Sequence, residues 1–209
     1  MVGRGIMKFI LVGILLLIGA LYVISVPQPP VKDNRTLPAD SSQGRAAIGG
    51  AFTALDHRGE PFTQDNLLGQ YHLMYFGFTY CPDICPASLL VMANTMDDLP
   101  PDITDQLRLV FVTVDPSRDT VEVIRQYVEN FHEKLIGVTG SEEQIQQLAK
   151  AYKVYYSKAE NDPVTGEYLV DHSSYMYLMD PKGRYVTHFP HNVSMQVLAD
   201  GLRRHIPHR

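Results

Sequence analysis

The chain has 209 residues, of which 45% are hydrophobic and 20% charged, and these proportions fit one globular domain with a further segment at one end. Its net charge is −5 and no stripe of Lys and Arg reverses that charge locally, so the composition argues against nucleic-acid binding. Two cysteines are too few for a small fold that disulfides hold together.

An uncharged apolar run near the N-terminus predicts a membrane anchor. Residues 9–26 are long enough to cross a bilayer, and Arg4 and Lys8 before them predict that the N-terminus stays in the cytoplasm while the rest crosses. A cleaved signal peptide is the alternative, although the run is long for one and no clear Ala-x-Ala site follows it. Three segments are expected: a single transmembrane helix within residues 1–26, a Pro-rich polar linker over 27–49, and a folded domain over 50–209.

Two nearly continuous apolar runs predict strands that are buried on both faces of a parallel sheet. They are YHLMYFGF at 71–78 and LRLVFVTV at 107–114. Between them, apolar residues recur at helical spacing after Pro86, and proline favours the first position of a helix. The pattern is that of a right-handed strand, helix, strand unit.

The second half of the chain continues the alternation of helices and strands. One helix is expected after Asp119, which we expect to cap it, and another at Ser141, where Gln144 completes a capping box. The remaining elements are a strand at 135–139, a hairpin of strands at 174–179 and 184–189 around the turn DPKG, and a last helix over 194–206. The sequence therefore predicts an α/β domain with a parallel core and a terminal hairpin.

Both cysteines lie in one short loop, CPDICP, directly after the first predicted strand. This is the carboxyl end of a central strand, where open α/β sheets bind their ligands. Because a residue before proline is pushed out of the helical region, we expect neither Cys81 nor Cys85 to lie inside a regular helix. Three roles compete: a structural disulfide, a redox couple and a pair of metal ligands. Closing so small a loop removes little entropy from the unfolded chain, which disfavours the first role and leaves the other two open.

A metal site built on two thiolates needs a further ligand, and histidine is a suitable one. Thiolates favour soft ions such as Cu(I), and an imidazole can complete a three-coordinate site. Of eight histidines, His172 is favoured by its position at the entry to a predicted strand, with Asp171 beside it to orient the ring. The other residues considered are interpreted as structural: Asp115 as a turn residue, Asp119 as a cap, and His188 with His191 and His205 with His208 as surface pairs.

Four ordered blocks of the sequence resemble the Sco/SenC family of membrane-anchored copper chaperones, in a match that covers residues 50–205. The blocks are GFTYCPDICP (77–86), FVTVDPSRDT (111–120), GVTGSEEQIQQLAKAYKVYYSK (137–158) and DHSSYMYLMDPKG (171–183). The resemblance implies a thioredoxin-like fold, in which helices flank a mixed sheet, and copper, as Cu(I) or Cu(II), bound by Cys81, Cys85 and His172. Tyr80 stands where relatives often carry histidine, so no ligand is expected there.

The resemblance also implies a role and partners. A family member would deliver copper to the dinuclear copper site of cytochrome c oxidase subunit II, or to another copper-receiving apoprotein, after loading from an upstream donor. Two functions therefore remain: a copper metallochaperone, which is not an enzyme and needs His172, and a thiol–disulfide reductase that uses Cys81 and Cys85 alone. Since no long Arg-rich presequence precedes the anchor, we expect a bacterial inner membrane with the domain in the periplasm, the alternative being the mitochondrial inner membrane facing the intermembrane space.

Overall fold

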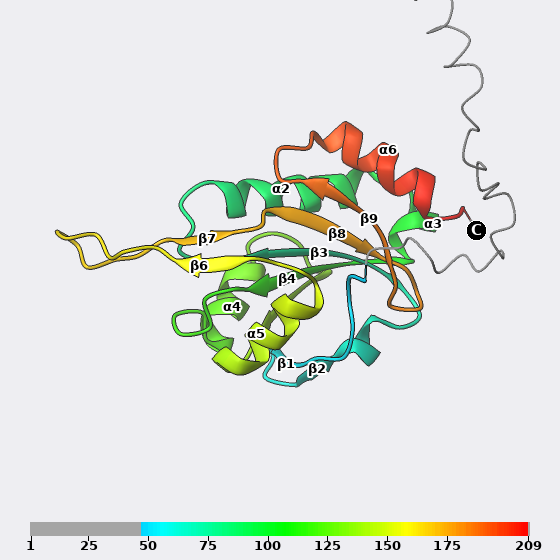
Figure 1. Cartoon of the computed structure of the whole chain (residues 1–209). Helices are drawn as coiled ribbons and strands as arrows, with labels where there is room; N and C mark the ends of the chain where they lie inside the picture. The colour runs from blue at the N-terminus through cyan, green and yellow to red at the C-terminus, as the bar shows by residue number, and fades with distance from the viewer. Residues whose placement is uncertain (1–46, 209) are drawn as a thin grey trace, which may run out of the picture. The chain divides into compact units, whose positions relative to one another are not determined.

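A seven-stranded mixed sheet forms the centre of the part of the chain that the structure describes, residues 47–208, in this computed structural model (Figure 1). The strand order is β2-β1-β5-β4-β3-β8-β9. The strands are β1 (Thr53–Asp56), β2 (Pro61–Thr63), β3 (Tyr71–Gly77), β4 (Leu107–Thr113), β5 (Leu135–Thr139), β8 (Tyr175–Met179) and β9 (Tyr185–Pro190). The three central strands β3, β4 and β5 are parallel, and the outer pairs are antiparallel.

The two longest apolar runs of the folded domain form the middle of this sheet. Every residue of β3 after Tyr71 is buried, and β4 is buried except at Arg108. The register pairs Met74 with Val110 and Gly77 with Thr113, so both strands end at the same edge. Since these side chains are removed from water on both faces of the sheet, their burial is a large part of the force that folds the domain.

Helices cover both faces of the sheet (Figure 1). Helices α2 (Ile84–Asp98) and α6 (Met195–His205) pack against each other on one face, while α4 (Val121–Val128) and α5 (Glu142–Ala151) lie on the other. Two short helices, η1 (Gln64–Leu67) and α3 (Pro101–Thr104), precede β3 and β4. The capping box predicted for α5 is present, and the hydroxyl of Ser141 accepts a hydrogen bond from the Gln144 amide at 3.2 Å.

The other predicted elements from residue 71 onward are confirmed. The strand at 135–139, the C-terminal hairpin and a last helix capped by Ser194 are all present. In the turn of the hairpin the amide of Gly183 donates to the carbonyl oxygen of Asp180 at 2.8 Å. Gly183 has a φ of 69°, a conformation that favours glycine.

Two local predictions are wrong. The cap of α4 is Thr120, whose hydroxyl accepts from the Val123 amide at 3.3 Å, while Asp119 is buried and receives hydrogen bonds from two threonines. Cys85 lies inside α2, because this helix begins at Ile84 and not at Pro86. A proline in the first turn loses no helical hydrogen bond, since amides there have no partner within the helix, and this offsets the restriction on the residue before it.

A two-stranded ribbon outside the main sheet was not predicted as strands. Strands β6 (Tyr156–Lys158) and β7 (Val170–His172) pair antiparallel, with Tyr156 opposite His172. We call residues 156–172 the arm, and Figure 1 shows that it projects beyond the edge of the sheet. Neither of its strands pairs with a strand of the seven-stranded sheet. Contacts other than backbone pairing with that sheet must therefore position the arm.

The predicted membrane anchor, residues 1–26, and most of the predicted linker lie outside the described residues. Within residues 47–208, no helix combines the length and the apolar character that crossing a bilayer requires. The anchor therefore stays a prediction from the sequence.

Candidate metal centre

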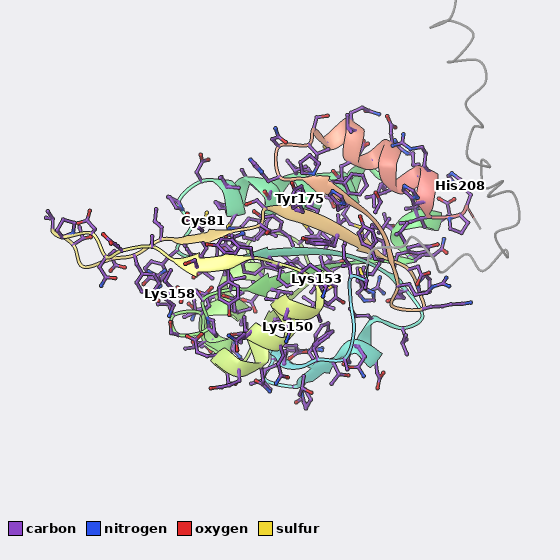
Figure 2. The ribbon with its side chains drawn as sticks, viewed as in Figure 1. Cys81, Lys150, Lys153, Lys158, Tyr175 and His208 are labelled. Atoms are coloured by element: carbon purple, nitrogen blue, oxygen red, sulfur yellow. The ribbon has the colours of Figure 1, made fainter. Side chains whose placement is uncertain are left out.

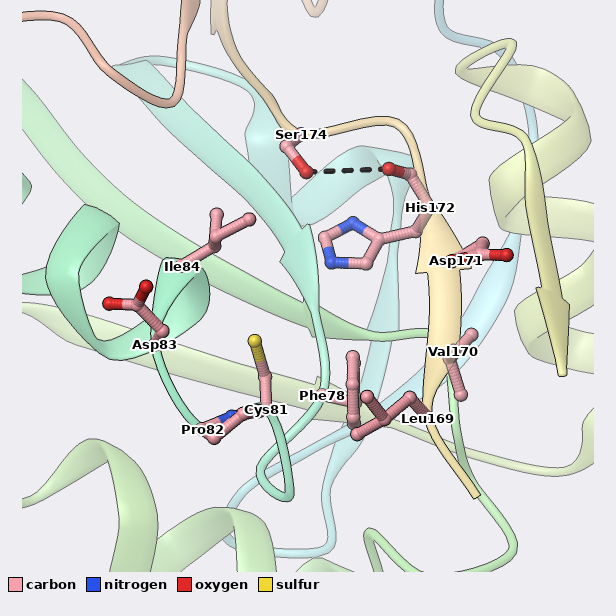
Figure 3. Close-up of a pocket in the computed structure, with 10 residues that line it drawn as sticks. All are labelled: Phe78, Cys81, Pro82, Asp83, Ile84, Leu169, Val170, Asp171, His172 and Ser174. Atoms are coloured by element: carbon pink, nitrogen blue, oxygen red, sulfur yellow. Dashed lines mark hydrogen bonds between the residues drawn. The ribbon is translucent and has the colours of Figure 1, made fainter. Parts of the chain in front are cut away.

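A pocket of about 300 Å³ lies at the carboxyl end of β3, between the cysteine loop and the arm. Figure 3 shows the sulfur of Cys81 and the imidazole of His172 pointing into this space. The residues that line it are Phe78, Cys81, Pro82, Asp83, Ile84, Leu169, Val170, Asp171, His172 and Ser174. The position agrees with the prediction that the site lies where the central strands end.

Cys81 and His172 line this pocket, and Cys85 lies next to them. The Nε2 atom of His172 lies 3.6 Å from the sulfur of Cys85, and the amide of Cys85 donates to the sulfur of Cys81 at 3.4 Å. Cys85 is fully buried and Cys81 is partly exposed, and neither forms a disulfide. The sequence prediction that these three residues share one site stands as a proposal, and these distances support it.

Local structure explains how the cysteine loop is held. The chain leaves β3 at Gly77, and the amide of Cys81 donates to the carbonyl oxygen of Phe78 at 3.3 Å. Cys85 occupies the first turn of α2, where an amide has no acceptor within the helix, and the sulfur of Cys81 serves as that acceptor. One cysteine of the loop thus accepts the hydrogen bond of the other cysteine's backbone amide.

The two thiols differ strongly in acidity. A hydrogen bond from Cys85 lowers the pKa of Cys81 to about 4, against the opposing effect of burial. The hydrogen bond to Cys81 raises the pKa of Cys85 instead, and burial raises it as well. Cys81 is therefore the thiolate of the pair at neutral pH, and Cys85 is the thiol that donates to it.

The ring of His172 is oriented by a backbone carbonyl group. Its Nδ1 atom lies 3.3 Å from the carbonyl oxygen of Ser173, which as an acceptor requires a proton on Nδ1 and leaves the lone pair on Nε2. The expectation that Asp171 orients the ring is wrong, because the described hydrogen bond of Nδ1 goes to Ser173 and the Asp171 side chain is exposed. A backbone oxygen is a common alternative to a carboxylate in this role.

The remaining candidate residues lie outside the pocket lining. Tyr80 is 56% exposed, and Figure 2 shows Cys81 and His208 at opposite ends of the sheet. The side chains of His188, His191, His205 and His208 are all exposed, as predicted for surface pairs. Asp115 and Asp119 are buried within the fold, which fits the interpretation that they are structural.

Asp119 ties the segment before the cysteines to the sheet. Its carboxylate accepts from the amide of Thr79 at 3.0 Å, from the hydroxyl of Thr79 at 2.5 Å and from the hydroxyl of Thr113 at 2.5 Å. Burial raises the pKa of Asp119, and these hydrogen bonds oppose that rise. Asp119 therefore joins the segment before Cys81 to β4 without lining the pocket.

Two thiols and one imidazole form a donor set that suits a soft metal ion such as Cu(I). Among residues 47–208, no group of three or more His, Cys, Asp and Glu side chains is already arranged around a metal position. Cys81, Cys85 and His172 would therefore have to move closer to one another to hold an ion together. Such a movement is compatible with the position of His172 on the arm, outside the ladder of the main sheet.

A family model described as SCO1/SenC matches residues 40–207. The chain belongs to the SCO1/SenC family. An SCO2-like protein of Rickettsia prowazekii is 41% identical over 194 residues, which cover 91% of this chain and 92% of that protein. The mitochondrial SCO1 homolog 1 of Arabidopsis thaliana is 42% identical over 175 residues, 84% of this chain and 52% of that protein.

Solved structures of SCO1/SenC proteins resemble the described domain. The crystal structure of Arabidopsis thaliana ScoI with copper bound has a TM-score of 0.69 at 44% identity and covers 75% of this chain and 96% of that one. Yeast Sco1 with copper bound has a TM-score of 0.71 at 37% identity and covers 77% of this chain and 89% of that one. These likenesses confirm a mixed α/β, thioredoxin-like fold.

Sequence pattern did not indicate several residues around the candidate site. Ile84 and Leu169 line the pocket although each is a large exposed hydrophobic residue, and Ser173 orients the histidine through its backbone. Arg118 and Tyr168 pack together next to the cysteine loop. Only the place of Arg118 in the block VDPSRDT, at the end of a buried strand, was a usable signal.

Proposed function

We propose that this SCO1/SenC protein is a copper metallochaperone that binds copper through Cys81, Cys85 and His172. The observation that carries the proposal is the distance of 3.6 Å between Cys85 Sγ and His172 Nε2, beside the pocket that Cys81 and His172 line. The free lone pair on Nε2 and the thiolate of Cys81 provide two donors without further proton loss, and Cys85 must lose a proton to become the third. Copper in the structures of relatives supports the identity of the metal.

The openness of the site suits transfer to a partner. Cys81 is partly exposed, so a ligand of a recipient protein can reach an ion there and exchange ligands one at a time. The proposed recipient is the dinuclear copper site of cytochrome c oxidase subunit II or another copper-receiving apoprotein, and a separate protein would supply the copper. The proposed location is the outer side of a bacterial inner membrane, with the mitochondrial inner membrane as the alternative, and the relatives include a bacterial protein and a mitochondrial one.

A titration tests the ligand set. The reduced full-length protein is titrated with Cu(I) against a competing chelator, and His172→Ala, Cys81→Ser and the control His188→Ala are compared with it. We expect one ion per chain, almost no binding in Cys81→Ser, and about tenfold weaker binding in His172→Ala, equivalent to about 1.4 kcal/mol. His188→Ala should bind as the wild type does, because this side chain is exposed and outside the pocket. Unchanged affinity in His172→Ala would refute the three-ligand site.

The difference between the two thiols favours a second candidate function, a thiol–disulfide reductase. The partly exposed thiolate of Cys81 would attack a partner disulfide and release one partner thiolate. Cys85 would then lose its proton and attack the mixed disulfide, which leaves a Cys81–Cys85 disulfide and a fully reduced partner. In this function His172→Ala retains the wild-type rate of reduction of a disulfide substrate, while Cys81→Ser loses it. The two assays together separate the two functions.

A further inference from the structure

Arg118 packs against aromatic rings from two other segments of the chain. The carbon at the centre of its guanidinium lies 3.7 Å from the ring centroid of Tyr168 and 4.6 Å from that of Tyr80. Tyr168 belongs to the arm, and Tyr80 directly precedes Cys81. The Arg118 side chain is only 16% exposed, so these cation–π contacts are partly shielded from water. One side chain therefore touches both the cysteine loop and the arm.

A buried carboxylate also holds the guanidinium of Arg118. The Nε of Arg118 donates to Asp115 Oδ2 at 2.5 Å, and the hydroxyl of Tyr168 donates to Asp115 Oδ1 at 2.8 Å. Asp115 is fully buried, so both bonds are protected from competition by water. A further contact, from Arg118 Nη1 to Glu167 at 3.3 Å, reaches the arm as well. We call Asp115, Arg118 and Tyr168 the clamp.

The clamp has features that stability alone does not explain. The Nη2 atom of Arg118 is buried without a hydrogen-bond partner, an arrangement that is unfavourable when water cannot replace the partner. The arm shares no strand ladder with the main sheet, so contacts of this kind determine where it lies. Tyr168 is close in sequence to His172, and Tyr80 is next to Cys81. The clamp thus joins the two parts of the chain that carry the proposed ligands.

We propose that Arg118 is a positioning residue: together with Asp115 and Tyr168 it holds the arm against the cysteine loop and so sets the position of His172 relative to Cys81 and Cys85. Arg118 does not line the pocket, and its effect on copper passes through His172. The effect of Arg118 on copper affinity rests on the proposed function, but the contacts that hold the arm do not depend on any metal.

The first test needs no copper. Hydrogen–deuterium exchange is measured on the reduced, metal-free full-length protein for the wild type, Arg118→Gln and Tyr168→Leu. Amides of the arm should exchange at least about fivefold faster in both variants, because local opening becomes easier when few other contacts hold a segment. The control is Arg184→Gln, which removes a similar arginine–carboxylate pair, with Asp180, in the turn between β8 and β9. Unchanged exchange of the arm in Arg118→Gln would overturn the inference.

The second test is a double-mutant cycle in Cu(I) affinity. Arg118→Gln should weaken binding about tenfold in the wild type, but less than about twofold in a His172→Ala background, because the effect passes through that ligand. Arg118→Lys keeps the charge but lacks the planar group that stacks on the rings, so it should lose most of the same affinity. Full additivity of Arg118→Gln and His172→Ala would overturn the positioning role, because a general loss of structure would act in both backgrounds.

Further variants keep both tests decisive. If Arg118→Gln does not fold, Tyr168→Phe removes only the hydrogen bonds of the Tyr168 hydroxyl, to Asp115 and with Ser117, and should produce a smaller change in the same direction. If the wild type binds no copper, the proposed function fails, and the exchange measurement still shows whether the clamp holds the arm.

Discussion

Replacing Gly77 by alanine should disturb the metal centre directly. A methyl group at this position would lie 2.8 Å from the sulfur of Cys85, 3.0 Å from Cε2 of Phe111 and 3.2 Å from Cε1 of Tyr75. All three neighbours are fully buried, so none can move into solvent. Overpacking of this kind costs about 1–3 kcal/mol. Because the sulfur of Cys85 is the nearest of these atoms, we expect it to be pushed away from its present position.

Two measurements follow from this contact. Urea unfolding of Gly77→Ala should show a midpoint lower by about 0.5–1.5 M, if m is about 2 kcal/mol/M. Cu(I) affinity should fall by about 10- to 100-fold, the usual cost of disturbing groups that orient a metal ligand. A matched control is Gly201→Ala, in which the added methyl group would meet the ring of Phe189 in a part of the core away from the pocket.

Comparing the two glycine variants shows whether copper affinity depends on the close contact with Cys85 or on overall stability. Both should lose stability, but only Gly77→Ala should lose affinity for copper. Wild-type affinity in a Gly77→Ala protein that is clearly destabilised would show that Cys85 is not a ligand or can adjust freely. Equal losses of affinity in Gly77→Ala and Gly201→Ala would show that affinity follows stability alone. Either outcome would refute the close-contact argument.

Three further predictions concern groups whose protonation or burial the fold controls. Burial lowers the pKa of His72 to about 4, below the value of about 6.5 expected for the unfolded chain, so the free energy of unfolding should fall by about 3 kcal/mol between pH 7 and pH 4. Urea unfolding at pH 7 and pH 4 measures this fall, which should be smaller in His72→Gln because glutamine does not titrate. An equal fall in the wild type and in His72→Gln would contradict the prediction. Since the pKa of Cys81 is lowered to about 4 and that of Cys85 is raised, iodoacetamide at pH 6 should modify Cys81 first, as mapped by mass spectrometry; prior modification of Cys85 would contradict it. Asp119→Ala should lower the free energy of unfolding by about 3 kcal/mol, because it leaves hydrogen-bond donors of Thr79 and Thr113 without an acceptor. Wild-type stability of that variant would mean that water replaces the carboxylate.

Local pattern was sufficient for most elements and for the location of the site. The apolar runs at 71–78 and 107–114 became the buried parallel strands, and the capping box at Ser141 and the turn before Gly183 were found as predicted. Each of these signals lies within a few neighbouring residues, whose periodicity or turn chemistry acts wherever the segment lies in the fold. The same reasoning placed CPDICP at the carboxyl end of a central strand.

Local pattern failed where a residue had two competing uses. Asp119 fitted a helix cap, but burial next to Thr79 and Thr113 gave its carboxylate three hydrogen bonds, while Thr120 serves as the cap. Cys85 precedes a proline, which disfavours a helix, yet it occupies the first turn of α2, where proline is tolerated. For Asp119, tertiary contacts decided between alternatives that were each possible locally, whereas for Cys85 the tolerance of proline in the first turn outweighed the restriction on the residue before it.

The sequence by itself determined the fold class, the edge of the sheet that carries the cysteines, and a short set of candidate ligands. Only the tertiary structure decided that Nε2 of His172 faces Cys85, that a backbone oxygen of Ser173 orients that ring, and that Arg118 packs against Tyr168. The reason is physical: periodicity and capping act between residues a few positions apart, whereas these contacts, apart from the one with Ser173, join segments separated by tens of residues and exist only after the sheet and the arm have packed.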